Sequence, residues 1–330
     1  MKSFPWENVM PSEKIISYLN SGKCFKLICG AGNQNTDEIM KLCALYAAAG
    51  CKFFDLNASV DAVRAAKEGI KFSGKEDDCF ICVSVGTKND PHISKCKIDS
   101  EKCVSCGSCE DVCIQKAIST DVSSRIINEE KCIGCGKCID VCPVQAIERY
   151  SKEISFSEIL PPLIKEGIDC IEYHTITDNE DEVMRGWSEI TKQFDGVLSV
   201  CIDRSKLGNE RLIGRLNAMK NACQNIFMVQ ADGAPMSGGS DDYRTTLQAV
   251  AAADIVLKAN ITPYVIMSGG TNSKTMALAR QCDLNVSGLA IGSYARKIVK
   301  EYIDNENFLR DKALFEKALN IAKELVNTCK

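Results

Sequence analysis

Apolar runs of strand length alternate with stretches of helical periodicity along most of the chain, which is typical of parallel βα units. Phe25–Gly30 and Phe53–Asn57 read as the first two strands, and helical patterns follow over Asp37–Ala49 and Val60–Gly69. A third apolar run spans Phe80–Gly86. Five further runs are Asp169–His174, Val197–Asp203, Ile226–Asp232, Tyr264–Ser268 and Gly288–Gly292. The pattern predicts eight strands, each except the third followed directly by a helix.

Eight alternating units predict an α/β fold, a (β/α)8 TIM-like barrel, with a doubly wound open sheet as the alternative. The first part of the barrel is expected over residues 1–90, an inserted module over 91–150, and the remaining strands and C-terminal helices over 151–330. About 270 residues lie outside the insert, close to the usual size of such a barrel. Active faces of these barrels lie at the C-terminal ends of the strands, so the insert after strand three is expected over the mouth.

Composition changes this picture mainly through cysteine, which occurs 20 times in 330 residues. The net charge is −4, and no Lys/Arg-rich run indicates nucleic-acid binding. Residues 1–20 lack a signal-peptide pattern and no apolar run has the length of a membrane span, so we expect a cytoplasmic protein without an integral membrane segment. In such a chain abundant cysteines indicate metal binding rather than disulfides.

Eight of the cysteines form an internal repeat of the pattern C-x2-C-x2-C-x3-C. The first run holds Cys103, Cys106, Cys109 and Cys113, and the second holds Cys132, Cys135, Cys138 and Cys142. The runs are offset by 29 residues, and Glu101-Lys102 and Ala117-Ile118 repeat with the same offset. Each half predicts a short strand, a cysteine loop, a short helix and a returning strand. Two such halves predict an α+β ferredoxin-like module of the bacterial two-cluster type.

Cluster chemistry explains this spacing. A cubane [4Fe–4S] cluster needs four thiolates, and the fourth cysteine of each run ligates the cluster held by the other half. We therefore predict two [4Fe–4S] clusters with crossed ligation. The ligands are Cys103, Cys106, Cys109 and Cys142 for the first cluster, and Cys132, Cys135, Cys138 and Cys113 for the second. Zinc, the alternative, prefers two spaced pairs to two runs of four.

Polar residues follow a period of two near the ends of four predicted strands, and residues two apart on a strand share a face. They are Asp55 and Asn57, Glu172 and His174, Asp203 (paired with Cys201), and Gln230 and Asp232. Together they predict a polar pocket at the barrel mouth beneath the clusters. The alternative is that each residue caps a helix or meets water.

Two glycine-rich stretches follow the last two strands, where barrels commonly bind phosphate through backbone N–H groups and helix N-termini. The first contains Gly269, Gly270, Thr271 and Asn272, and the second begins with Gly292 and Ser293. They predict a site for FMN or another phosphate-bearing ligand, and the alternative is that the glycines only form turns. A third stretch, Asp232–Gly239, is long enough to cover a ligand.

These stretches together carry a family resemblance over nearly the whole chain. The sequences Phe25–Ala31, Asp232–Gly238, Gly269–Asn272 and Gly292–Arg296, around the two cysteine runs, resemble the light-dependent period protein A family, known mainly from cyanobacteria. The resemblance implies an iron–sulfur protein that senses cellular redox state and, in cyanobacteria, feeds it to the circadian clock. A member from an organism without a clock could keep the chemistry and lose that role.

Three functions remain open from the sequence. A redox sensor would transmit a change at the clusters through the barrel to a redox or signalling partner. An oxidoreductase would pass electrons from the clusters to a flavin or substrate in the mouth, although no lysine apart from Lys88 is found near a predicted strand end to support a reduced flavin. A plain electron carrier would leave the barrel inert. The sequence singles out no catalytic residue.

Overall fold

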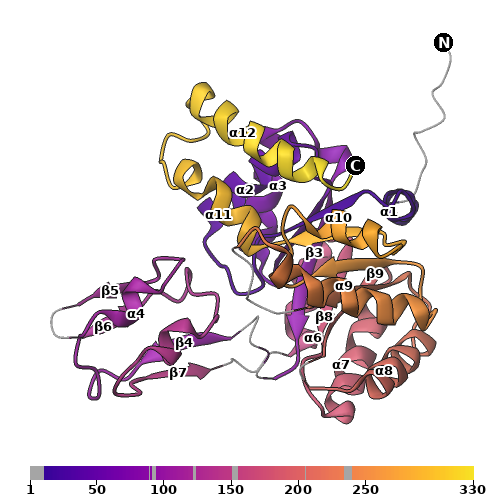
Figure 1. The fold of residues 1–330 in the computed structure, drawn as a ribbon, viewed down its shortest axis with the longest axis horizontal. Helices are drawn as coiled ribbons and strands as arrows, with labels where there is room; N and C mark the ends of the chain where they lie inside the picture. The colour runs from indigo at the N-terminus through magenta and orange to yellow at the C-terminus, as the bar shows by residue number, and fades with distance from the viewer. Residues whose placement is uncertain are drawn as a thin grey trace.

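The molecule is built on a closed barrel of eight parallel strands, in the order β1-β12-β11-β10-β9-β8-β3-β2 (Figure 1). The computed structural model describes residues 11–88, 90, 94–121, 124–150, 155–204, 206–233 and 240–330, without the side chains of Pro11, Ser12 and Asp203. The barrel strands are β1 (Cys24–Ile28), β2 (Phe53–Asn57), β3 (Phe80–Gly86), β8 (Cys170–His174), β9 (Val197–Asp203), β10 (Phe227–Asp232), β11 (Val265–Ser268) and β12 (Gly288–Ile291). All eight predicted strands are present, which confirms the TIM-like barrel and rules out the open sheet.

Helices surround the barrel, and each strand has one after it along the chain. They are α2 (Thr36–Ala48), α3 (Val60–Phe72), α6 (Phe156–Lys165), α7 (Glu180–Gln193), α8 (Asn209–Asn221), α9 (Tyr243–Lys258), α10 (Thr275–Gln281) and α11 (Ser293–Ile303). The third strand has its own helix, α6, which the sequence prediction missed because the insert separates it from β3. Outside the insert, the structure describes three further helices: α1 (Pro11–Asn20), the 3-10 helix η1 (Glu76–Asp78) and α12 (Lys312–Asn327). None of the described helices is long and apolar enough to cross a membrane.

The insert between β3 and α6 forms a small module beside the barrel (Figure 1). Its elements are β4 (Lys95–Ile98), α4 (Ser108–Asp111), β5 (Ile118–Thr120), β6 (Arg125–Ile127), α5 (Lys137–Asp140) and β7 (Ile147–Tyr150). The outer strands β4 and β7 pair antiparallel, and so do the inner strands β5 and β6. The two sequence repeats therefore interlock as the predicted ferredoxin-like fold requires.

The interior of the barrel is apolar at one end and polar at the other. Phe53, Phe80 and Met228 fill the end where the strands begin, and Ile15 and Leu19 of α1 pack against them. Further along the same strands the side chains of the same parity become polar: Asp55 on β2, Ser84 on β3, and Gln230 and Asp232 on β10. Side chains two apart on a strand share a face. The polar site is thereby confined to the C-terminal ends of the strands.

Capping side chains define where four of the eight barrel helices begin, α2, α3, α7 and α9. Ser59 accepts a hydrogen bond from the Ala62 N–H at the start of α3, and Asn179 accepts one from Glu182 N–H at the start of α7. Helix α11 is one of the four without such a cap: its N-cap residue is Gly292, and no side chain caps its first turn. The backbone N–H groups at this helix end therefore lack a side-chain acceptor, at the rim of the mouth.

Candidate iron–sulfur sites and barrel-mouth pocket

Two cavities of the ferredoxin-like module are lined by cysteines from both halves of the repeat. One is lined by Cys103, Cys106, Cys109 and Cys142, and the other by Cys132, Cys135, Cys138 and Cys113. The fourth cysteine of each run therefore lies with the first three cysteines of the other run. Eight free thiols in two groups of four have the donor chemistry and number that two [4Fe–4S] clusters need.

The backbone around these cysteines suits a cluster on both sides. Gly107 and Gly136, the N-caps of α4 and α5, have φ values of +88° and +79°, which favour glycine and keep each cysteine loop tight. The N–H of Ala117 donates to Cys113 Sγ at 3.3 Å, and the N–H of Ala146 donates to Cys142 Sγ at 3.2 Å. Such hydrogen bonds stabilise a ligating thiolate and tune the cluster potential.

Cys96 is a fifth thiol at the second cavity that the motif did not reveal. It lies on β4, is buried, and lines the same cavity as Cys132 and Cys138. The position 29 residues later is Arg125, which lines the first cavity. The repeat is thus symmetric in its ligand cysteines and asymmetric at this strand position. The only sign of this in the sequence is the position of Cys96 itself, seven residues before the first run.

The module is fixed to the barrel near the mouth. Lys95 donates through Nζ to the carbonyl oxygens of Glu129 at 2.6 Å and Cys132 at 2.7 Å, and also to the carbonyl oxygen of Gly32 in the loop after β1. The N–H of Gln34 donates to the carbonyl oxygen of Glu130 at 3.0 Å. The second cysteine run therefore faces the barrel.

A pocket of about 690 Å³, partly open to solvent, occupies the mouth. Ten of the residues predicted from the sequence line it: Asp55, Glu172, His174, Gln230, Asp232, Gly269, Gly270, Thr271, Gly292 and Ser293. Ser84 and Arg296 also line it, as does Ile133 from the second cysteine loop. The side chain of Asp203 and residues 234–239 of the loop after β10 lie outside the described part of the chain.

Two predicted residues have other contacts and do not line this pocket. Asn57 donates through Nδ2 to the carbonyl oxygen of Asn33, so it supports the loop after β1. Asn272 donates through Nδ2 to the carbonyl oxygens of Asp242 at 2.6 Å and Ser240 at 3.2 Å. It therefore connects the loop after β11 to the start of α9. Both amides are buried, and they position backbone segments around the pocket.

The floor of the pocket rests on a buried lysine that the sequence analysis missed. Lys26 of β1 is fully buried, with Nζ 2.9 Å from Asp55 Oδ2, in an ion pair with Glu172, and 2.9 Å from Gln230 Oε1. Burial alone would lower the pKa of Lys26, but the Asp55 and Glu172 carboxylates raise it well above its usual value. A charged residue in the apolar strand Cys24–Ile28 was its sequence signal.

The pKa values of the two carboxyl groups around Lys26 are shifted in opposite directions. Burial raises the pKa of Asp55 despite the neighbouring ammonium group, and the hydroxyl of Ser84 donates to Asp55 Oδ1 at 2.6 Å. Burial also opposes ionisation of Glu172, but Lys26 and His174 outweigh it and lower the pKa of Glu172. Glu172 therefore holds its negative charge more firmly than Asp55 does.

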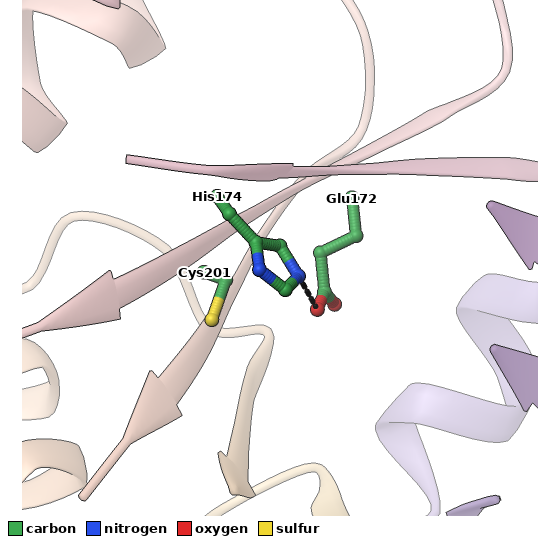
Figure 2. A group of neighbouring side chains, drawn as sticks. All are labelled: Glu172, His174 and Cys201. Carbon is green, nitrogen blue, oxygen red and sulfur yellow. Dashed lines mark hydrogen bonds and ion pairs between the residues drawn. The ribbon is translucent and has the colours of Figure 1, made fainter. Parts of the chain in front are cut away.

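His174 joins this network from the end of β8. Figure 2 shows Glu172, His174 and Cys201 close together, with His174 Nε2 3.2 Å from Glu172 Oε1. His174 Nδ1 lies 3.1 Å from Asp90 Oδ2. Burial alone would lower the pKa of His174, but Asp90 and Glu172 raise it well above its usual value. The imidazolium is thus held between two carboxylates.

Glu172, His174 and Cys201 also have the donor types of a metal site, with ligand atoms within 4.8 Å of one another. However, Glu172 already accepts from Lys26, from Gln230 Nε2 at 2.5 Å and from Ser199 Oγ at 3.1 Å. Both nitrogens of His174 face carboxylates. The ammonium group of Lys26 and the imidazolium group of His174 already neutralise the carboxylates that a metal ion would need. The arrangement is therefore a hydrogen-bonded ion network.

Comparison with known proteins agrees with the two-part architecture. The family described as "Light dependent period A C-terminal domain" matches residues 162–328, and "4Fe-4S binding domain" matches residues 96–119 and 125–148. The protein "Light dependent period A" from Synechococcus elongatus is 31% identical over 302 residues, which cover 87% of this chain and 84% of that protein. The chain belongs to the light dependent period A family. As a member with both matched 4Fe-4S motifs, it is an iron–sulfur protein.

Two solved structures are similar to this chain at low sequence identity. Tryptophan synthase from M. tuberculosis is 10% identical with a TM-score of 0.51, and the similarity covers 98% of this chain and 99% of that chain. A truncated 3-deoxy-D-arabino-heptulosonate 7-phosphate synthase from Thermotoga maritima is 10% identical with a TM-score of 0.47, covering 92% of this chain and 85% of that chain. The first of these likenesses concerns the fold alone.

Proposed function

We propose that this chain binds two [4Fe–4S] clusters and responds to cellular redox state, relaying it to a redox or signalling partner. One observation carries the proposal: each cavity of the module is lined by three cysteines of one run and the fourth cysteine of the other. The proposed ligands are Cys103, Cys106, Cys109 and Cys142 for the first cluster, and Cys132, Cys135, Cys138 and Cys113 for the second. When bound, each cluster supplies one-electron redox chemistry.

The protein's own residues give the two sites different surroundings. Cys106 is exposed, so electrons or oxidants from solvent or a partner can reach the first site directly. The second site is lined by Arg296, Lys297 and Lys300 of α11, on the barrel side. We infer that a redox partner approaches the first site and that the barrel responds to the second.

The physiological setting is part of the same proposal. The name of the S. elongatus relative refers to a light-dependent period, and we propose an analogous input to a timing or signalling partner for this chain. Free thiols at all 20 cysteines suit a reducing compartment such as the cytoplasm.

Replacing single cysteine ligands by alanine tests whether the fourth cysteine of each run ligates the other run's cluster. The wild-type protein, purified without oxygen, should contain about eight irons and matching sulfide, with two EPR signals after reduction. Cys142→Ala and Cys103→Ala should leave the same residual EPR signal, and Cys113→Ala and Cys132→Ala should leave the other one. If Cys142→Ala instead gives the residual signal of Cys132→Ala, the ligation is not crossed.

Limited proteolysis tests redox response. Cleavage rates should differ among reduced, oxidised and cluster-free protein, because a sensor must change the conformation of the surface that its partner binds. Identical cleavage in all three states would contradict the sensing role while leaving cluster binding intact.

One observation favours a second candidate, an oxidoreductase with a phosphate-bearing ligand such as FMN in the mouth. That observation is the polar mouth pocket beside the second cysteine site. A flavin assay on the same anaerobic sample separates the two functions: stoichiometric flavin would support the enzyme, and absence of flavin together with eight irons would support the sensor.

A further inference from the structure

The second cysteine cavity and the barrel-mouth pocket share a wall. Ile133, Ser293 and Arg296 line both spaces. Ser293 and Arg296 are three residues apart at the start of α11, so both lie on the same face of that helix. A change of charge in the cysteine cavity and a ligand in the mouth would therefore act on the same side chain, that of Arg296.

Arg296 carries a buried charge that has no anionic partner among the residues the structure describes. Its side chain is only 6% exposed, and Nη1 donates to the carbonyl oxygen of Cys29 at 3.1 Å. Its Nε is buried without a hydrogen-bond partner, and within the described ranges no carboxylate lies within ion-pair distance of its guanidinium group. Buried guanidinium groups are normally paired, because an uncompensated buried charge is costly.

The surroundings of Arg296 in the mouth fit a phosphate group. Gly269 and Gly270 have φ values of +70° and +77°, so the backbone after β11 turns tightly at the rim. The first turn of α11 begins at Gly292 without a side-chain cap, and this 11-residue helix directs its positive end to the same rim. The charged floor around Glu172 and His174 suits polar groups on the rest of the ligand. The ligand class is thus a small phosphate-bearing molecule with a polar body.

We propose that the mouth binds a phosphate-bearing molecule through Arg296, and that Arg296 couples this binding to the redox state of the neighbouring iron–sulfur site. The coupling rests on the function proposed above. One electron added to the cluster on Cys113, Cys132, Cys135 and Cys138 places an extra negative charge on the other side of Arg296, so the anion binds less tightly. By linkage, bound anion makes that site harder to reduce by the same factor.

Anaerobic equilibrium dialysis with inorganic phosphate tests the proposal on the full-length, cluster-loaded protein. Reduction is electrochemical, with methyl viologen as the mediator, so that no competing anion is added. Phosphate should bind the oxidised protein at least about fivefold more tightly than the reduced protein, the lower end of typical coupling. In an EPR-monitored redox titration, saturating phosphate should lower the midpoint potential of the signal that Cys132→Ala removes, and not of the other signal.

Variants separate Arg296 from general charge effects. Arg296→Gln should abolish phosphate binding and the potential shift, and Arg296→Lys should retain part of both. Arg185→Gln, which removes an exposed arginine of α7, should change neither. Phosphate binding that is equal in both redox states, or unchanged in Arg296→Gln, would overturn the proposal. In either case a count of about eight irons would leave the proposed cluster function standing.

A comparison of FMN with riboflavin tests which group is recognised. Tighter binding of FMN would support recognition of the phosphate group, and equal binding would overturn it.

Discussion

The ammonium group of Lys26 lies 2.9 Å from the carboxylate of Asp55, and both side chains are buried inside the barrel. The two residues come from neighbouring strands, β1 and β2, in the layer directly above the apolar end of the barrel. Glu172 completes the ion network from β8, on the other side of β3. This network closes the floor of the mouth pocket and determines which groups a ligand would meet.

Removing the lysine tests how much this network contributes to stability. Lys26→Met would leave Asp55 and Glu172 buried without their cation, so we expect a loss of about 3–5 kcal/mol in the free energy of unfolding. Urea denaturation measures it, and Lys23→Met, at an exposed position just before β1, is the control and should stay within about 0.5 kcal/mol of wild type. A loss below about 1 kcal/mol for Lys26→Met would mean that the network adds little.

His174 should make stability depend on pH. Its pKa in the folded protein is raised well above the ordinary 6.5, so its ion pairs with Asp90 and Glu172 contribute fully below about pH 6.5. That contribution is lost as the pH rises through the raised pKa. The difference in unfolding free energy between wild type and His174→Gln should therefore shrink as the pH is raised above 6.5. A difference that stays constant over this range would show that His174 does not titrate as the paired cation.

A side chain at Gly269, on the rim of the mouth, should lower the stability of the protein. A Cβ on Gly269 would lie 1.5 Å from Asp232 Oδ1, and the residue has a φ of +70°. Gly74 has nearly the same φ, +67°, with no atom within 4 Å of its Cβ position, so Gly74→Ala measures the backbone cost alone. By thermal unfolding, Gly269→Ala should be less stable than Gly74→Ala by about 1–3 kcal/mol, the usual cost of overpacking. Equal losses would mean that Asp232 moves aside freely.

Cys96 should prove dispensable for cluster assembly. It lines the second cavity but stands outside the ligand motif, so Cys96→Ala should keep about eight irons, while Cys138→Ala should lose iron. Iron and sulfide assays on anaerobically purified variants decide this. Iron loss in Cys96→Ala equal to that in Cys138→Ala would make Cys96 a ligand.

Local patterns were sufficient for the architecture. Apolar runs such as Phe80–Gly86 are bounded by polar turns, so all eight strands were found, most with ends within one residue of those observed. The third helix was missed because 69 residues (87–155) separate α6 from β3, and adjacency along the chain was the only criterion. The period of two also located the polar layer, since side-chain alternation is a property of any strand.

The contacts of individual polar residues were not predictable in the same way. Asn57 and Asn272 looked like ligand residues by position, yet both bind backbone carbonyl groups of neighbouring loops. Sequence spacing gives the face of a strand or the start of a loop. It does not give the loop conformation that decides which acceptor is nearest.

The sequence by itself determined which polar residues share a face near the strand ends, and it determined the two cysteine runs. Strand periodicity and ligand spacing are local properties of the chain. Only the tertiary structure decided that Lys26 joins Asp55 and Glu172, and that Arg296 faces both the mouth and the second cysteine cavity. These relationships join residues far apart in the sequence. They exist because closing the barrel brings the inward side chains of β1, β2 and β8 together. The insert also places the second cysteine loop against α11, the helix after the last barrel strand.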